Sequence, residues 1–456
     1  MREIKKDLIK ENDEFILDIK RLGINGEGVG FYNRMAVFVD GAIPGEGHDV
    51  VVTKVDGKMA YAKTKEIKHQ SPYRKQPECP YFDICGGCSI MHIDYEESLK
   101  LKRELVIEAL NRYTKINTKQ FEIKQTVKSD YPFAYRNKEQ LYLKKDNNQT
   151  KVCMIRPNSN ITFPIDKCLI EQDLINEINP KILKLIDDLK IDLYDKKSKS
   201  GLIKQLVIRQ NKDREALVCF IVSNNNEKLK TLAKEVIKIK GVKSVYININ
   251  KDDKSIDAFG KETIHLEGEK YLVEKIGKIK YQIYPTTFFQ LNSYQAEKLY
   301  DIVLKNCKLS FKERVLDAYC GVGTIGLYLA HMAKEVIGVE YNKEAVLAAN
   351  ENSKLNNIKN AKFLQGDATE LLPRLIENET FDVLVVDPPR TGLEEKFINA
   401  ILESGIKKII YVSCNPATLA KNLEILKQKY NINSITPVDM FSQTAHVETV
   451  VSMTHK

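Results

Sequence analysis

The sequence predicts a multidomain α/β protein whose C-terminal part, residues 281–456, is a doubly wound parallel sheet. Several short apolar runs there end in polar residues, and stretches of helical spacing fill the intervals between them. Residues 1–67 instead show short alternating runs interrupted by glycines, which is typical of a small β-barrel. Residues 68–280 combine a cysteine cluster with strands and helices, which indicates a central α+β domain.

Length and composition are those of a soluble chain with room for two or three domains. Of the 456 residues, 43% are hydrophobic and 29% are charged, and the net charge is +9. Such a charge is compatible with a nucleic-acid partner but is shared by many lysine-rich proteins. The charged start MREIKKDLIKENDEF is unlike a signal peptide, and no apolar run is long enough to span a membrane. We therefore expect a cytoplasmic protein whose nine cysteines serve metal binding or catalysis rather than disulfides.

The N-terminal region, residues 14–67, predicts about five short strands separated by glycines at hairpin spacing. Five strands in so short a segment indicate a barrel of the OB type, a design that often binds nucleic acid. The alternative is a structural module without a ligand. Basic residues on the last strands favour RNA binding. They are Lys54, Lys58, Lys63 and Lys65.

The cysteine cluster reads Cys79-Pro-Tyr-Phe-Asp-Ile-Cys85-Gly-Gly-Cys88. Three thiolates this close can surround one soft metal centre, and the two glycines let backbone N–H groups approach its sulfides. Cys153 and Cys168 are the available candidates for a fourth ligand. Zinc is an alternative, but no second C-x2-C pair or histidine pair follows. Three unrelated core cysteines are the other alternative.

The rest of the central region predicts a substrate domain. Residues 94–113 have helical spacing, and residues 133–156 and 201–210 alternate as strands do. A helix at 226–239 precedes the strand VKSVYININ, which completes an α+β order. Four basic residues could contact phosphates, although a solvated surface charge is the ordinary role of each. They are Arg136, Lys138, Lys204 and Arg209.

A glycine-containing turn follows the strand at 314–317. Gly321 and Gly323 stand where this strand meets a helix, so the backbone can close on a nucleotide-like ligand at the helix N-terminus. The next strand ends in Glu340, the position that binds ribose hydroxyls in such folds. The glycine pattern is not the dinucleotide fingerprint, which argues against a nicotinamide cofactor.

Two further strands end in acids, with Asp367 after 361–364 and Asp387 after 381–386. Successive strands with polar carboxyl ends describe one ligand cleft in a Rossmann-like sheet. Together they look like an S-adenosylmethionine-dependent methyltransferase. Asp-Pro-Pro loops such as the one at Asp387 also occur in amino-methyltransferases, which need no cysteine nucleophile. Cys414 is therefore the discriminating residue.

Cys414 ends the buried strand Lys-Ile-Ile-Tyr-Val-Ser and precedes Asn415-Pro416. Proline cannot continue a central strand and restricts the residue before it. Cys414 is thus presented at the carboxyl end of a strand, where open α/β sheets bind ligands. A reactive thiol needs a lowered pKa, and we expect polar strand-end and loop contacts to lower the pKa of Cys414.

Glu448 lies in an otherwise apolar terminal strand, in the segment Thr444-Ala-His446-Val-Glu448-Thr-Val-Val. A buried glutamate is costly unless it is paired or functional, and burial raises its pKa toward the range useful for a general base. The pattern leaves one alternative open, an edge-strand glutamate that faces solvent beside His446.

Five motifs resemble those of the bacterial RNA uracil-5-methyltransferase family. They are SCNPATLAKNL with Cys414, DPPRTGL at 387–393, FFQLN at 288–292, DAYCGVGTIGL at 317–327 and HVETV at 446–450. The cysteine pattern also resembles this family, and INGEGVGFYNRMAVFVDGAIPGE resembles the TRAM domain found on RNA-modifying enzymes. The resemblance covers nearly the whole chain.

The resemblance implies a role for each matching residue. Cys414 would add to uracil C6, which makes C5 nucleophilic, and Glu448 would remove the C5 proton. The residues implied to contact S-adenosylmethionine are Gln290, Tyr319, Glu340, Asp367 and Asp387. Those implied to hold a [4Fe–4S] cluster are Cys79, Cys85, Cys88 and Cys168, which leaves Cys153 as a core thiol. Tyr319 stands where many relatives have phenylalanine.

The resemblance also implies a substrate. The tRNA-modifying branch of the family typically lacks the TRAM module and the cysteine cluster, whereas the ribosomal branch commonly has both. We therefore expect a uridine in 23S rRNA as the target, presented unstacked or flipped out, with no membrane and no obligate protein partner. The alternatives are a tRNA uracil-5-methyltransferase and a non-catalytic RNA-binding protein on the same fold. A cytosine-5 methyltransferase would usually carry its cysteine in a Pro-Cys context.

Overall fold

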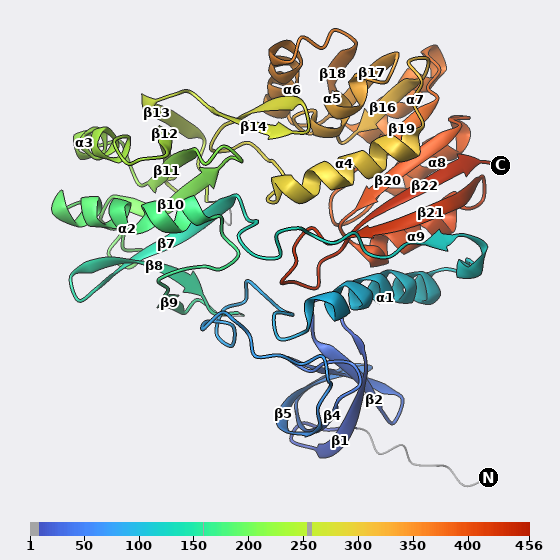
Figure 1. Cartoon of the computed structure of the whole chain (residues 1–456), viewed down its shortest axis with the longest axis horizontal. Coiled ribbons are helices and arrows are strands. Elements are labelled where there is room, and N and C mark those ends of the chain that lie inside the picture. Colours follow the sequence, from blue (N-terminus) through green and yellow to red (C-terminus); the bar gives the residue numbers. More distant parts are fainter. Residues whose placement is uncertain (1–8, 158, 253–257) are drawn as a thin grey trace.

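Three sheets and a two-stranded ribbon organise residues 9–157, 159–252 and 258–456, which are the residues that the computed structural model describes. Figure 1 shows a small barrel near the N-terminus, a middle sheet and a large C-terminal sheet. Among the described residues, no helix combines the length and the apolar character needed to cross a lipid bilayer.

The N-terminal sheet closes into a five-stranded barrel in the order β1-β2-β3-β5-β4. Its strands are β1 (Glu14–Leu22), β2 (Gly28–Tyr32), β3 (Met35–Val39), β4 (Gly47–Asp56) and β5 (Met59–His69). Side chains alternate between the two faces of a strand, so Leu17 and Ile19 of β1 are buried inside the barrel with Val37 and Val39 of β3. The predicted small barrel is confirmed.

A buried ion pair fixes the barrel to the segment that follows it. Glu46 is 1% exposed and accepts hydrogen bonds from Nε and Nη2 of Arg74, each at 2.6 Å, while His48 Nε2 lies 2.9 Å from its carboxylate. Burial alone would raise the pKa of Glu46, but the bonds from Arg74 and His48 hold that pKa well below its ordinary value.

Helix α1 (Tyr95–Tyr113) connects the barrel to the C-terminal sheet. It begins after Asp94, whose carboxylate accepts a hydrogen bond from the backbone N–H of Glu97. Its buried face packs against α9 (Pro416–Leu426) and joins the core of the C-terminal sheet. After the short 3-10 helix Thr118–Gln120, strand β6 (Glu122–Ile123) extends the same sheet beside β21. Residues 95–123 therefore pack with the C-terminal sheet, although the sequence assigns them to the central domain.

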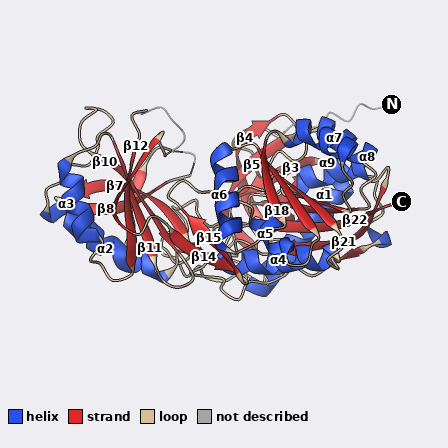
Figure 2. Cartoon of the chain, turned by 90° about the horizontal axis from the view of Figure 1, so that it is seen from above, coloured by secondary structure: helices blue, strands red, loops and turns tan. Residues whose placement is uncertain are grey.

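The middle sheet has the strand order β13-β12-β11-β10-β7-β8-β9. Its strands are β7 (Lys138–Asp146), β8 (Gln149–Ile155), β9 (Thr162–Pro164), β10 (Ile203–Gln210), β11 (Ala216–Val222), β12 (Val242–Ile249) and β13 (Glu262–Gly268). Helices α2 (Asp173–Asp188) and α3 (Glu227–Val236) cover one face, as Figure 2 shows. The other face packs against the C-terminal core, which is why every residue of β11 is buried.

The C-terminal sheet has the strand order β18-β17-β16-β19-β20-β22-β21-β6. Its long strands are β16 (Arg314–Ala318), β17 (Glu335–Glu340), β18 (Ala361–Gln365), β19 (Val383–Val386), β20 (Lys408–Ser413), β21 (Tyr430–Val438) and β22 (Glu448–His455). Neighbouring strands are parallel except that β22 runs antiparallel to both β20 and β21. The chain therefore has the predicted doubly wound sheet, with one reversed strand inserted in it.

Helices cover both faces of this sheet. Those on one face are α4 (Ser293–Cys307), α5 (Thr324–Ala330) and α6 (Lys343–Leu355), together with the ribbon of β14 (Leu272–Ile276) and β15 (Ile279–Ile283). Those on the other face are α7 (Ala368–Asn378), α8 (Glu395–Glu403), α9 and α1. Alternate residues of each strand enter the two cores: Val385 faces the first and Leu384 faces the second.

Candidate active site

The pairing of β20 with β22 brings Cys414 and Glu448 to the same edge of the sheet. The last residue of β20, Ser413, is paired with Thr449. Cys414 directly follows Ser413 in the chain, and Glu448 directly precedes Thr449. Residues opposite each other on antiparallel strands have Cβ atoms about 5 Å apart. The thiol and the carboxyl group are therefore neighbours at the carboxyl ends of the parallel strands.

The turn after β20 fixes the backbone of Cys414. Helix α9 begins at Pro416, and the side chain of Asn415 accepts a hydrogen bond from the N–H of Ala417 at 3.1 Å. Asn415 Nδ2 also donates to the carbonyl oxygen of Arg390 at 3.1 Å, and Thr418 Oγ1 donates to the same oxygen at 3.2 Å. The loop that follows Asp387 is thereby fastened to the turn that carries the thiol.

The electrostatic environment of Cys414 differs from the prediction. Burial and, to a lesser extent, the charges of Glu448 and Asp387 raise the pKa of the Cys414 thiol to about 11, even though Arg390 opposes the shift. The expectation of a lowered pKa is wrong for the substrate-free chain. Two acids face the thiol, and a single cation does not offset them and the partial burial.

The carboxyl group of Glu448 has a raised pKa. Burial raises the pKa of its carboxyl group to about 8, the charge of Asp387 adds to this shift, and Arg390 opposes it. Because β22 lies between β20 and β21, Glu448 is not on an edge strand, and the residue is half-buried, which excludes the edge-strand alternative. Burial likewise raises the pKa of Asp387 to about 7. Two carboxyl groups with raised pKa values thus accompany one thiol.

A cavity of about 770 Å³ opens beside this group. Four of the residues predicted to contact a methyl donor line it, namely Gln290, Tyr319, Glu340 and Asp387. The fifth, Asp367, is not among the lining residues that the structure describes. Its carboxylate instead caps α7, accepting a hydrogen bond from the N–H of Thr369 at 2.7 Å.

The turn after β16 forms the floor of the cavity. Tyr319 has a φ of +66°, which is uncommon and strained for a residue with a side chain. Gly321 has a φ of +55°, and a Cβ at this position would meet no atom within 4 Å. Its N–H donates to Glu340 Oε2 at 3.1 Å, which links the ends of two neighbouring strands. The turn thus leaves open space for a ligand above its backbone.

Sequence reasoning missed Asp317, which is the penultimate residue of β16 and is 1% exposed. Burial raises the pKa of its carboxyl group to about 8, although the N–H of Gly326 opposes the shift. The presence of an acid just before the glycine turn could have identified Asp317 from the sequence. The aromatic residues Tyr284 and Phe289 also line the cavity and were not singled out.

The four basic residues of the central region are largely engaged within the protein. Arg136 pairs with Glu139 at 2.9 Å, and Lys138 lies 5.3 Å from the ring centre of Phe259. Lys204 lies over the ring of Tyr194. Arg209 is 3% exposed and donates to the carbonyl oxygens of Pro285 and Thr287, which line the cavity. Arg209 therefore supports the cavity wall instead of meeting phosphate.

The cysteines predicted to bind a cluster are free thiols. Cys79, Cys85 and Cys88 belong to the loop before α1, and Cys168 follows β9. The N–H of Gly87 points to Cys85 Sγ at 3.4 Å, and burial together with the charges of Cys85 and Cys79 raises the pKa of Cys88 to about 12. Within the described residues, no group of three or more Cys, His, Asp or Glu is arranged to hold a metal ion. Cys153 is buried in β8, as a core thiol would be.

Comparison with known families decides the identity of this site. Residues 94–456 match the model of the family described as tRNA (Uracil-5-)-methyltransferase. The chain belongs to this family. It is therefore an S-adenosylmethionine-dependent RNA uracil-5-methyltransferase, as the sequence motifs predict.

The relatives match almost the whole chain. An uncharacterized RNA methyltransferase of Halalkalibacterium halodurans is 40% identical over 98% of both chains. One from Listeria monocytogenes is 37% identical over 97% of both chains. Among solved structures, the tRNA (uracil-54, C5)-methyltransferase of Pyrococcus abyssi, in complex with S-adenosyl-L-homocysteine, superposes with a TM-score of 0.77. It is 28% identical, and the match covers 96% of this chain and 99% of that one.

The electrostatics predict how Cys414 reacts with an alkylating reagent. Only the thiolate is nucleophilic, so below the pKa of about 11 the alkylation rate should rise about tenfold per pH unit. Replacing Arg390 with methionine removes the cation that lowers this pKa and should slow alkylation at neutral pH. Peptide mass spectrometry after timed iodoacetamide treatment measures the rate at Cys414. The exposed Arg374→Met is the matched control, and a rate independent of pH would contradict the raised pKa.

Proposed function

We propose that the chain methylates C5 of a uridine in 23S rRNA, with Cys414 as the nucleophile and Glu448 as the proton acceptor. The observation that carries this proposal is the strand register that sets Cys414 opposite Glu448 beside the cavity. A single nucleophile next to a single base is what methylation of uracil C5 requires, because C5 becomes nucleophilic only after C6 has been attacked.

The proposed reaction uses each group once. Cys414 first loses its Sγ proton to solvent; the thiolate sulfur then forms a bond to C6, and the electrons of the C5–C6 double bond move to C5 and the adjacent carbonyl oxygen. S-adenosylmethionine, when bound, supplies the methyl group that C5 takes. The carboxylate of Glu448 then removes the proton from C5, the C5–C6 double bond forms again, and the thiolate of Cys414 leaves. The raised pKa of Glu448, about 8, suits a proton acceptor that works near neutrality.

We propose that the cavity binds the methyl donor through Gln290, Tyr319, Glu340 and Asp387. Its position at the carboxyl ends of β16, β17 and β19 is where such sheets bind nucleotides, and the space above Gly321 fits a ligand close to the backbone. Both carboxylate oxygens of Glu340 accept backbone N–H groups and keep lone pairs for ribose hydroxyls. Asp367, which is exposed, would act mainly by fixing the start of α7.

We propose that the region at 1–67, of which residues 1–8 lie outside the described part of the chain, forms a TRAM domain that binds the RNA, next to regions at 68–280 and 281–456. The barrel presents exposed aromatic side chains, including Phe31 (53% exposed) and Tyr61 (37% exposed). Lys54 lies over the ring of Tyr61. Aromatic rings with nearby cations suit the stacking of unpaired bases along a phosphate backbone.

Ribosomal RNA is favoured as the substrate by the combination of this barrel with the cysteine cluster. Transfer RNA is the second candidate, because the family is named for tRNA (uracil-5-)-methyltransferases and the similar Pyrococcus abyssi enzyme is a tRNA (uracil-54, C5)-methyltransferase.

The choice between the two RNAs is tested by offering them side by side. We expect label from S-adenosylmethionine in 5-methyluridine of unmodified 23S rRNA and not of unmodified tRNA, with the product mapped by nuclease digestion and mass spectrometry. Label in tRNA alone would overturn the ribosomal substrate while leaving the roles of Cys414 and Glu448 intact.

The roles of the two residues are separated by their variants. Glu448→Gln cannot accept the C5 proton, so we expect methylated RNA to remain covalently attached to it, visible as a retarded band on a denaturing gel. Cys414→Ala is the matched control and should form no adduct while still binding S-adenosylmethionine. Normal turnover by Glu448→Gln would assign the proton acceptor elsewhere.

We further propose that Cys79, Cys85, Cys88 and Cys168 hold a [4Fe–4S] cluster. The donor set is chemically suited to iron and sulfide, all four thiols are free, and the charges of Cys79 and Cys85 act on Cys88. We expect iron and acid-labile sulfide in the chain purified without oxygen, and their loss in Cys168→Ser but not in Cys153→Ser. Bound zinc, or no metal at all, would contradict this assignment.

A further inference from the structure

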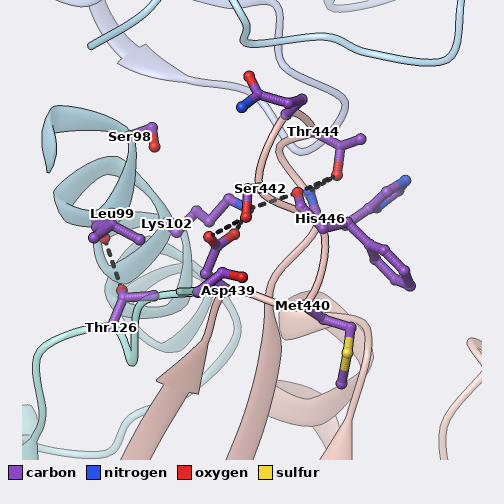
Figure 3. Close-up of polar contacts among 12 residues, drawn as sticks. Ser98, Leu99, Lys102, Thr126, Asp439, Met440, Ser442, Thr444 and His446 are labelled. Carbon is purple, nitrogen blue, oxygen red and sulfur yellow. Dashed lines mark hydrogen bonds and ion pairs between the residues drawn. The ribbon is translucent and has the colours of Figure 1, made fainter. Parts of the chain in front are cut away.

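The loop that leads into Glu448 is fastened by a lysine without any exposed surface. Lys102 projects from α1, and its Nζ forms an ion pair with Asp439 and a 3.0 Å hydrogen bond to the carbonyl oxygen of Phe441 (Figure 3). Both charged side chains are 0% exposed. Lysine is almost never fully buried unless it is paired, and an apolar pair of similar size is often at least as stable. Fold stability alone is a weak explanation for this pair.

Three side chains, those of Lys102, Tyr95 and Ser442, donate hydrogen bonds to the carboxylate of Asp439. Its second carboxylate oxygen accepts hydrogen bonds from the hydroxyl groups of Tyr95 and Ser442, each at 2.7 Å. Its backbone N–H donates to the carbonyl oxygen of Val127 at 3.0 Å. Asp439 directly follows β21, so these contacts fix the start of the loop at residues 439–447.

A chain of hydrogen bonds continues from Lys102 toward the site. The carbonyl oxygen of Phe441 also accepts the N–H and the hydroxyl group of Thr444, each at 3.0 Å. Thr444 Oγ1 in turn accepts the N–H of His446 at 3.3 Å. His446 stands two residues before Glu448, the first residue of β22. Figure 3 shows Thr444 and His446 on the loop beside Lys102 and Asp439.

Other segments hold the same loop. Asn292, which caps α4 two residues after the cavity residue Gln290, donates to the carbonyl oxygen of Met440 at 3.0 Å. The N–H of Ser89 donates to the carbonyl oxygen of Gln443 at 2.9 Å, and the N–H of Ala445 donates to Ser89 Oγ at 3.1 Å. The loop contains neither helix nor strand, so its shape depends on these contacts.

We propose that Lys102 and Asp439 are positioning residues that set the carboxylate of Glu448 against the C5 proton. The inference rests on the proposed role of Glu448 as the proton acceptor. The nucleophile Cys414 lies at the end of β20 and the start of α9, outside the loop. The ion pair therefore serves the release half of the reaction, in which the proton leaves C5 and the C6–sulfur bond breaks, more than the attack on C6.

A purely structural role predicts a different result. General loosening of the fold would slow formation and release of the adduct together. Displacement of Glu448 alone slows release, and misplacement by about 1 Å can slow a catalytic step by about a hundredfold. Comparing the two rates within one variant therefore distinguishes positioning from stability.

The test is the double variant Lys102→Met/Asp439→Asn, which removes both charges without leaving one of them unpaired. In single turnovers at saturating RNA, we expect the covalent adduct to form within about twofold of the parent rate and to be released about tenfold or more slowly. The matched control is Lys275→Met/Asp213→Asn, which makes the same two substitutions in an ion pair of 2.8 Å that lies outside both the loop and the cavity lining. It should leave both rates unchanged.

Equal slowing of both steps, or slowing of neither, would overturn the inference. Should the double variant fail to fold, Thr444→Val decides, because it removes only the hydroxyl group that accepts the His446 N–H and should also slow release selectively. Glu448→Gln, run in parallel, separates the two proposals. If that variant accumulates no adduct, the proposed role of Glu448 fails, whereas an adduct there with normal release in the double variant refutes the positioning role alone.

Discussion

The antiparallel pairing of β22 between β20 and β21 is the constraint on which the site depends. In a wholly parallel sheet, the strand that carries Glu448 would begin at the far edge, away from the strand ends that surround the cavity. Because β22 is reversed, its first residue instead meets the last residues of β20. The pairing of Ser413 with Thr449 then sets Cys414 opposite Glu448. If β22 slipped by one residue along β20, the two side chains would lie on opposite faces of the sheet.

Burial gives this site its chemical character. Burial raises the pKa values of Cys414, Glu448 and Asp387 together. The thiol of the substrate-free chain is therefore protonated near pH 7, and the pKa values of the two carboxyl groups lie near neutrality. Arg390 is the cation that opposes the shifts of both Cys414 and Glu448, and its backbone is tied to the turn after the thiol. The same partly enclosed arrangement that raises the pKa of Glu448, as its proposed role of base requires, thus also raises the pKa of the Cys414 thiol.

Much of this arrangement could be predicted from local rules. Pro416 stops β20 wherever that strand lies, so the strand-end position of Cys414 follows from the sequence, and so do the strand-end acids that line the cavity. The residue that lies opposite Glu448 could not be predicted, because this neighbour depends on strand order and register between distant segments. The amphipathic pattern of α1 likewise showed which face is apolar but not that it packs on the C-terminal sheet. The direction of the Cys414 pKa shift depends on burial, which only the folded chain reveals.

The central claim, that Cys414 attacks uracil beside a base that must remove the C5 proton, is tested most directly with RNA that carries 5-fluorouridine. Fluorine at C5 leaves no proton to remove, so the reaction should halt with the methylated base bound to sulfur. We expect peptide mass spectrometry to find the adduct on Cys414 alone. An adduct on Cys320, which lines the cavity, or the absence of any adduct despite methyl transfer to ordinary uridine, would contradict the account.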